Sequence, residues 1–234
     1  MNKLGWGIGI FGSMALIVVL FLTSFKFVLY HDINFYEKEY SKYNVLDAVK
    51  MEMKDVLYVT EEMMDYLIDK RADLVVETVV DGNEREFFND REKLHMQDVK
   101  SLFMDGLMIR RIALAITIVS LLLLVFMKVN LLRIISRSFL IATVLVATIL
   151  GISAIYISSN FNAVFIEFHH LFFNNDYWIL NPETDLMINI LPENFFFDVV
   201  KSVGLTFGVL LAILLIVAVI INTTQWHKKY KSIH

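Results

Sequence analysis

Four long uncharged, apolar runs dominate the pattern of hydrophobic and polar positions along the chain. They are Leu4–Phe25, Ile112–Met127, Phe139–Ser159 and Ser202–Asn222. A helix needs about 20 such residues to cross the hydrocarbon core of a membrane, and three runs reach that length unaided. The second run is shorter, but Arg110 and Arg111 can extend their charged ends outward and add a turn. The pattern therefore predicts four membrane-spanning helices.

The long segment after the first run has patterns of its own. Apolar positions in residues 46–74 recur at helical spacing, with charges on the opposite face. We expect two helices there with a break near Tyr58–Thr60, because Thr60 followed by two glutamates suits an N-cap. Residues 75–88 alternate and turn at Asp81-Gly82, which predicts a hairpin or a short extended pair.

A further helix is predicted to lead into the second span. Asn89 or Asp90 can cap it, and helical spacing then continues past His95, with only Gly106 as a possible interruption. At 1.5 Å per residue, a straight helix would hold His95 roughly 25 Å above Ile112. If His95 works at the bilayer, the helix must therefore bend at Gly106 or lie along the membrane surface.

The charges predict an orientation. All 25 acidic residues fall within Asp32–Asp105 and Glu167–Asp198, whereas residues 1–3, 128–137 and 223–234 carry basic charge alone. The positive-inside rule places these basic segments, with both termini, in the cytoplasm and the acidic segments outside. Arg110 and Arg111 run against the rule but are outnumbered. The first run lacks a small-residue cleavage site, so we expect a retained helix and not a cleaved signal peptide.

The predicted fold class is therefore an α-helical integral membrane protein. It has four transmembrane helices, a mostly helical extracytoplasmic cap, and a re-entrant or surface-lying connector. The predicted parts are helix 1 (1–30), the cap (31–107), helix 2 (108–127), a cytoplasmic loop (128–137), helix 3 (138–159), the connector (160–198), helix 4 (199–222) and a cytoplasmic tail (223–234).

Composition narrows the chemistry. The chain is 57% hydrophobic, above the roughly 45–50% of soluble domains, and it has no cysteine. It therefore does not rely on disulfides and cannot use a thiol nucleophile. The mild acidity of the outer loop argues against nucleic acid as a partner, since nucleic-acid binding needs a basic stripe.

The histidines are the main candidates for chemistry. His31, His95, His169 and His170 fall in the outer segments, and the remaining two, His227 and His234, in the tail. His95 and Asp98 share a helical face, and a carboxylate that holds one imidazole nitrogen orients the ring as a general base. Apolar neighbours would keep His169 neutral, although a lone histidine there also fits an interfacial aromatic belt.

The connector and the missing motifs limit the other possibilities. Pro182 and Pro192 force extended or turning backbone, and irregular backbone at membrane depth must be buried in protein or line a wet cavity, which suggests a pocket. The sequence has no G-x-S-x-G elbow and no H-E-x-x-H helix. Three outer histidines with Asp98 or Asp185 could still bind zinc.

Two segments together resemble a known family. They are "REKLHMQDVKSLF", residues 91–103, and "FHHLFFNNDYWILNPETDLMINILPENFF", residues 168–196. Placed between spans in a four-helix chain, this pair resembles the lipoprotein intramolecular transacylase (Lit) family of low-GC Gram-positive bacteria. The resemblance implies transfer of an acyl chain from the sn-2 position of a diacylglyceryl-cysteine to the α-amine of the same cysteine, which gives lyso-form lipoprotein.

The resemblance also implies a site. Two histidines are thought to be essential in the family, and the matching positions are His95 and His169, whereas His170 falls at a variable position and is not carried over. The residues expected to support them are Arg91, Asp98, Trp178 and Asp185. The residues expected at the lipid are Phe172, Phe173, Arg110 and Arg111; either arginine, or Trp178, is a candidate to steady an oxyanion or a headgroup.

The expected partners are diacylated lipoproteins and membrane lipids, with no cofactor, no metal, no nucleic acid and no obligate protein partner. The expected location is a bacterial cell membrane, with the site on the extracytoplasmic face. Two alternatives remain open. One is a zinc-dependent membrane hydrolase that uses the same histidines, and the other is a non-catalytic membrane adaptor whose acidic cap binds a partner.

Overall fold

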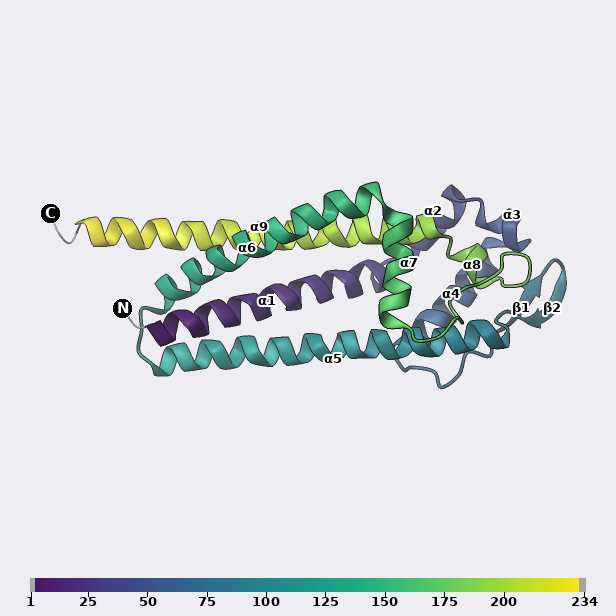
Figure 1. Cartoon of the computed structure of the whole chain (residues 1–234), viewed down its shortest axis with the longest axis horizontal. Coiled ribbons are helices and arrows are strands. Elements are labelled where there is room, and N and C mark those ends of the chain that lie inside the picture. The colour runs from purple at the N-terminus through teal and green to yellow at the C-terminus, as the bar shows by residue number, and fades with distance from the viewer. Residues whose placement is uncertain (1–2, 232–234) are drawn as a thin grey trace. The chain divides into compact units, whose positions relative to one another are not determined.

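The computed structural model describes the backbone of residues 3–231 and side chains from 3 to 225, so the predicted tail, with His227 and His234, lies largely outside the described side chains. Figure 1 shows the elements along the chain. They are α1 (Lys3–Tyr30), α2 (Ile33–Lys42), α3 (Val45–Val49), α4 (Met53–Leu67), β1 (Glu77–Val80), β2 (Asn83–Glu86), α5 (Asp90–Phe126), α6 (Leu131–Ser159), α7 (Phe161–Phe172), α8 (Met187–Ile190) and α9 (Glu193–Lys231).

The chain divides into two compact units, each described here by itself. The span unit comprises residues 1–25, 108–159 and 202–234, and the cap unit comprises residues 26–107 and 160–201. Helices α1, α5, α6 and α9 are long and apolar enough to cross a membrane. The prediction of four membrane-spanning helices is confirmed, and among the described residues no helix of the connector reaches that length.

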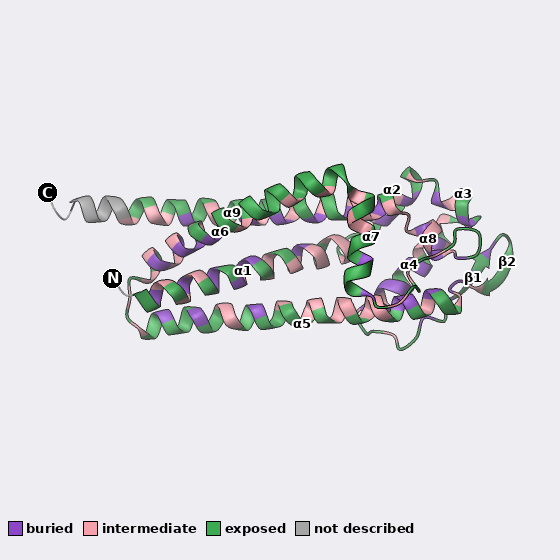
Figure 2. Ribbon diagram, in the orientation of Figure 1, coloured by how far each residue is buried: buried purple, intermediate pink, exposed green. Residues whose placement is uncertain are grey.

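The span unit packs through a narrow apolar seam and small residues. Ile17, Phe139, Ala142 and Phe207 belong to its buried cluster. The rest of α6 and α9 is mostly exposed and apolar (Figure 2). Helices packed in lipid use close approach instead of extensive burial from water, because lipid chains are as apolar as the side chains that they contact. The sparse burial of this unit therefore fits a membrane-embedded bundle.

Stacked aromatic rings form the centre of the cap unit. Tyr36 and Tyr40 of α2 both stack on Phe195 at the start of α9, with centroids 5.8 and 6.4 Å away. The Tyr40 hydroxyl lies 2.6 Å from Thr60 Oγ1, and Thr60 Oγ1 donates to the Val56 carbonyl at 2.8 Å. These contacts join α2, α4 and α9 in one core.

The predicted helix break near Tyr58–Thr60 is wrong, because α4 runs unbroken from Met53 to Leu67. Thr60 is fully buried in the middle of this helix and does not cap its start. Its hydroxyl bonds back to the carbonyl four residues earlier, which is how threonine is accommodated in a helix interior. The polar residues after Thr60 reflect the exposed face of one helix.

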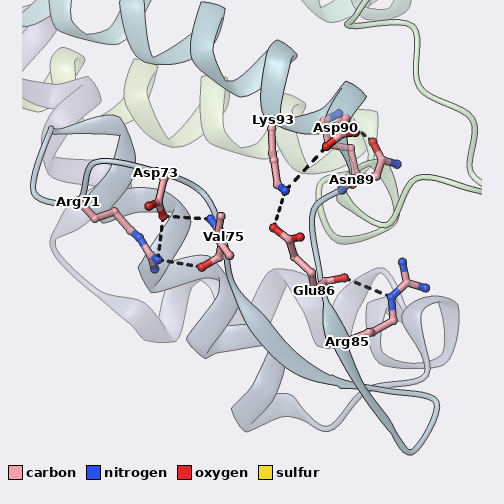
Figure 3. Close-up of polar contacts among 9 residues, drawn as sticks. Arg71, Asp73, Val75, Arg85, Glu86, Asn89, Asp90 and Lys93 are labelled. Carbon is pink, nitrogen blue, oxygen red and sulfur yellow. Dashed lines mark hydrogen bonds and ion pairs between the residues drawn. The ribbon is translucent and has the colours of Figure 1, made fainter.

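The predicted hairpin is confirmed. β1 and β2 pair antiparallel with Thr78 opposite Arg85, and Asp81 and Gly82 have φ values of 50° and 75°. Positive φ at both central residues is the requirement of the favoured two-residue hairpin turn. Figure 3 shows that Lys93 of α5 reaches Glu86 at the end of β2, at 2.5 Å, so the hairpin is joined to the helix that carries His95.

Helix α5 begins with a reciprocal cap. Asn89 Oδ1 accepts from the Glu92 backbone N–H at 3.0 Å, and Glu92 Oε2 accepts from the Asn89 N–H at 2.7 Å. This arrangement satisfies donors that a helix start would otherwise leave unpaired. The prediction of a cap at Asn89 or Asp90 is thus confirmed at Asn89, and the helix continues unbroken through Gly106.

The connector is bent, as the prolines predict. Helix α7 ends in extended backbone at Phe173, and a turn follows in which Asp185 N–H donates to the Asn181 carbonyl at 2.8 Å. The loop before α6 is shorter than predicted, because α6 already begins at Leu131, where Asn130 Oδ1 accepts from the Arg133 N–H at 3.1 Å.

Candidate active site

His169 is held on α7 by a hydrogen bond of its own helix. The side chain is 8% exposed, and its Nδ1 lies 2.6 Å from the Phe165 carbonyl oxygen. A carbonyl only accepts, so this contact places the ring proton on Nδ1. In the neutral ring, Nε2 then carries the free lone pair. The helix therefore fixes both the position and the tautomer of this imidazole.

Aromatic rings surround His169. Its ring centroid lies 4.4 Å from that of Phe165, 5.6 Å from that of Phe173 and 4.8 Å from that of Trp178, which is stacked at 30°. Burial among these rings lowers the pKa of His169, the Phe165 carbonyl acts in the opposite direction, and His170 adds to the lowering. The ring is thus kept neutral and basic at physiological pH.

His95 lies beside His169 although the two are distant in sequence. It projects from the second turn of α5, is 7% exposed, and its ring centroid lies 6.0 Å from that of His169. The Phe173 ring meets it edge-on at 5.3 Å. Its Nδ1 is buried and has no hydrogen-bond partner among the described residues. The structure therefore brings together the two histidines that the sequence singles out.

The predicted orienting role of Asp98 is wrong in its geometry. The Asp98 carboxylate accepts a hydrogen bond from Asn175 Nδ2 at 2.8 Å, and no hydrogen bond joins it to His95 among the described residues. Spacing of three places both side chains on one helical face, but it does not decide which partner each one takes. Asp98 instead fastens the connector to α5.

Arg91 and Asp185 also hold the connector against the start of α5. Arg91 donates to the Asp176 carbonyl. The buried Asp185 carboxylate accepts from Asn89 Nδ2 at 2.8 Å and from the Asn181 N–H at 2.7 Å. Burial opposes ionisation of Asp185, but these hydrogen bonds outweigh it and lower its pKa. Both contacts therefore fix the connector against the start of α5, the helix that carries His95.

Glu92 is a supporting residue that the sequence reasoning missed. It is fully buried, and besides its cap contact its Oε1 accepts from the Met187 N–H of α8 at 2.6 Å. The capping pattern gives a reason for a glutamate at this position. Its second partner is 95 residues away, and no local signal announces it.

The remaining predicted residues are placed unequally. Phe173 is buried against both histidines, whereas Phe172 is 48% exposed and packs against Phe168. Trp178 stacks on His169. Arg110 and Arg111 belong to the span unit and are not among the residues gathered here.

The ligand set of a zinc site is not assembled. Protein zinc sites use three or four histidine, cysteine or carboxylate ligands. Across residues 3–225 no three such side chains gather closely enough to hold a metal ion. His31 stacks on Phe27, and His170 is exposed with only its contact to Trp178 nearby.

Comparisons with known proteins show the family and the fold. The family model of lipoprotein intramolecular transacylase Lit matches residues 10–196, which include both histidines. The fold is similar to that of the membrane-integral lipoprotein intramolecular transacylase Lit from Bacillus cereus, with a TM-score of 0.72 and 21% identity over 100% of both chains.

Two structures of variants of that Bacillus cereus protein are also similar. The variant with a histidine replaced by arginine gives a TM-score of 0.70 at 21% identity, over 99% of this chain and 96% of the other. The variant with a histidine replaced by alanine gives 0.68 at 20% identity, over 100% and 97%. No curated protein matches. By its family model and its fold, the chain belongs to the lipoprotein intramolecular transacylase family and is a membrane-integral acyltransferase.

Proposed function

We propose that this protein makes lyso-form lipoprotein by acid–base catalysis with His95 and His169. It moves the sn-2 acyl chain of a diacylglyceryl-cysteine to the α-amine of the same cysteine. The observation that carries the proposal is the buried pair itself: two imidazoles from separate elements, with centroids 6.0 Å apart, in an aromatic surrounding. No other two imidazole rings are stacked or tilted together in this way among the described residues.

His169 is the better candidate for the base. An α-amine has a pKa near 8 and must lose a proton as it attacks an ester. The Phe165 carbonyl keeps the proton of neutral His169 on Nδ1, so Nε2 is free to accept that proton. The amine nitrogen then bonds to the ester carbon, the bond to the glyceryl oxygen breaks, and that oxygen takes up the proton. We assign this last transfer to His95, the neighbouring ring, which receives the proton from His169 and donates it to the glyceryl oxygen.

The reaction needs no nucleophile from the protein. Nucleophile and ester are parts of one substrate molecule, so the enzyme only has to orient them. In well-aligned cases such orientation lowers the reaction barrier by several kcal/mol. This agrees with a chain that has no cysteine and no serine elbow. It also explains why the site consists of proton carriers and aromatic walls.

Helix α7 can meet lipid next to the base. Phe168, Leu171 and Phe172 are 42%, 75% and 48% exposed, while His169 on the same helix is buried. An amphipathic helix of this kind rests in the membrane interface with its apolar face in the acyl region. With the orientation expected from the positive-inside rule, α7 would lie at the outer leaflet, where diacylated lipoproteins are anchored.

Mass spectrometry of lipoprotein N-terminal peptides tests the proposal. The chain is expressed in a host whose lipoproteins are ordinary diacyl forms, and we expect N-acyl, S-monoacylglyceryl peptides to appear. His95→Ala and His169→Ala should each lower their formation by about 10²–10⁴-fold, the usual contribution of general acid–base catalysis. His170→Ala, an exposed neighbour on the same helix, is the matched control and should stay near the unmodified level.

Each outcome is decisive. If the unmodified protein yields no lyso-form product, the proposed reaction is wrong. If it does and either alanine variant of the pair matches it at equal protein level, the two-histidine mechanism is wrong. Equal losses in His169→Ala and His170→Ala would mean that disruption of α7, and not lost proton transfer, explains the effect of the change at His169.

A further inference from the structure

Trp178 carries a buried hydrogen-bond donor with no partner. Its Nε1 is inaccessible and pairs with no group among the described residues. A buried donor left unpaired costs about 1–3 kcal/mol, and such exceptions in folded proteins are often found at catalytic sites. An indole N–H can only donate, so an acceptor is what it lacks. In the proposed reaction the substrate brings such an acceptor, the carbonyl oxygen of its ester.

The position of Trp178 relates this donor to the chemistry. Its ring stacks on His169 at 4.8 Å and 30°, and His170 packs edge-on against it at 5.1 Å. Of the side chains predicted to steady an oxyanion, Trp178 is the one that belongs to the same unit as the histidine pair, and it contacts His169. The donor is therefore next to the base that faces the reacting amine.

The backbone around Trp178 is firmly held. Asn175 fastens the preceding residues to Asp98, and its Oδ1 accepts from the Tyr177 N–H at 3.0 Å. Arg91 donates to the Asp176 carbonyl, and the Ile179 N–H donates to that same carbonyl at 3.1 Å. The backbone that carries the donor is therefore preorganised for stabilising developing charge, and a substrate oxygen reaches the inaccessible Nε1 once the side chains around it shift.

We propose that Trp178 Nε1–H donates to the carbonyl oxygen of the substrate ester and stabilises the oxyanion formed during acyl transfer. This inference rests on the proposed function of the same site. As the amine nitrogen bonds to the carbonyl carbon, the π electron pair moves onto the oxygen that Trp178 contacts. When that pair returns, the bond to the glyceryl oxygen breaks, and the glyceryl oxygen receives the proton that left the amine. Trp178 keeps its own proton throughout.

His95 is the rival for this role, and the comparison favours Trp178. His95 Nδ1 is likewise buried and unpaired, but a neutral imidazole nitrogen either donates or accepts according to the tautomer. His95 is also needed to carry a proton in the proposed reaction. The indole has no other chemistry available to it, so donation to the substrate is the one use that its unpaired N–H has.

The test removes the N–H and keeps the ring. Benzothienylalanine, with sulfur in place of the indole N–H, is introduced at position 178 by stop-codon suppression. The enzyme in proteoliposomes then converts a synthetic diacyl lipopeptide, with the product measured by mass spectrometry. We expect kcat to fall about 10²–10³-fold with KM little changed, as for loss of one oxyanion donor. Trp178→Phe, a smaller ring without the donor, should fall at least as far.

Controls separate this inference from the proposed function. Trp6→Phe in α1 of the span unit controls for loss of a tryptophan, and wild-type protein made through the same suppression controls for the method. An inactive wild type would refute the proposed function, whereas an active wild type with an equally active benzothienylalanine form would refute only the role of Trp178. A rise in KM with unchanged kcat would also overturn it, since the contact would then serve binding alone.

Discussion

The two units bury different kinds of polar side chain. In the described part of the span unit, every buried polar residue is a hydroxyl: Ser13, Ser24, Ser120, Ser136, Ser138 and Thr143. In the cap unit two are hydroxyls, Thr60 and Thr78, and four are ionisable: Glu92, His95, His169 and Asp185. Among the described residues, all of the buried carboxylates and imidazoles therefore lie in one unit, at the start of α5 and along the connector.

The partners of these groups explain the difference. Ser13 and Ser24 each donate to a carbonyl four residues earlier on α1, at 2.8 Å. Such local bonding satisfies a hydroxyl where lipid offers no partner. Glu92 and Asp185 instead bond to groups of other elements, and His169 meets His95 across two helices. In the span unit, Ser13 and Ser24 thus bond within their own helix, and Ser138 and Thr143 have no partner among the described residues. In the cap unit, the buried carboxylates hold distant segments together.

Removal of the Glu92 carboxylate should break this cap-unit arrangement most strongly. It accepts from the N–H groups of Asn89 and Met187, so Glu92→Ala leaves one part-buried and one buried donor unpaired. At about 1–3 kcal/mol for each, we expect the free energy of unfolding to fall by about 2–5 kcal/mol. Thermal unfolding in detergent, followed by near-UV circular dichroism, measures the change.

Glu61→Ala is the matched control, because Glu61 is an exposed glutamate in the interior of α4. Its effect should stay within about 0.5 kcal/mol, as for ordinary surface positions. Equal loss in both variants would show that the two contacts of Glu92 do not stabilise the cap unit.

The sequence predicts more of the span unit than of the cap unit, because contacts in the cap unit join distant segments. The spans are local properties of the chain, because length and hydropathy alone decide whether a helix can cross a membrane, so all four could be predicted. The hairpin and the cap at Asn89 are local too. The pairing of His95 with His169 was reached only through family resemblance, since no periodicity connects residues that lie on different elements.

The failures concern residues whose partners are distant. Thr60 reads locally as a helix start, but its hydroxyl pairs with Tyr40 of another helix in the core. Asp98 has the right spacing to hold His95, yet Asn175 takes its carboxylate. Glu92 looks like a capping residue and also bonds to Met187. In each case tertiary contacts decide among options that local spacing leaves open.

The span unit can be tested through its close helix contacts. A Cβ added at Gly12 would lie 2.6 Å from Ser120 Cβ on α5, whereas one added at Gly7 on the same helix would meet nothing within 4 Å. We expect Gly12→Ala to lower the free energy of unfolding by about 1–3 kcal/mol, the usual range for overpacking. Gly7→Ala should be neutral or slightly stabilising, because alanine favours a helix over glycine by about 0.5–1 kcal/mol.

Thermal unfolding in detergent compares the two variants directly. Activity per folded molecule should stay unchanged in both, because the buried ionisable groups belong to the cap unit. If Gly12→Ala unfolds at the same temperature as Gly7→Ala, the stability of α1 does not depend on the close contact with Ser120.

The smallest expected effect is a shift, to lower pH, of the point at which the fall in rate steepens. Below pH 8 the rate should fall about tenfold per unit as the substrate amine is protonated. Because burial lowers the pKa of His169, protonation of the base should steepen the fall to about a hundredfold per unit only below 6.5, the ordinary histidine value.

The free energy of unfolding should also fall at low pH. The unfolded chain binds this proton at higher pH than the folded chain, so the folded state loses stability as pH drops below 6.5. Initial rates of lipopeptide conversion between pH 5 and 9 locate the point at which the fall in rate steepens, and a point at or above 6.5 would mean that the aromatic surrounding does not keep His169 neutral.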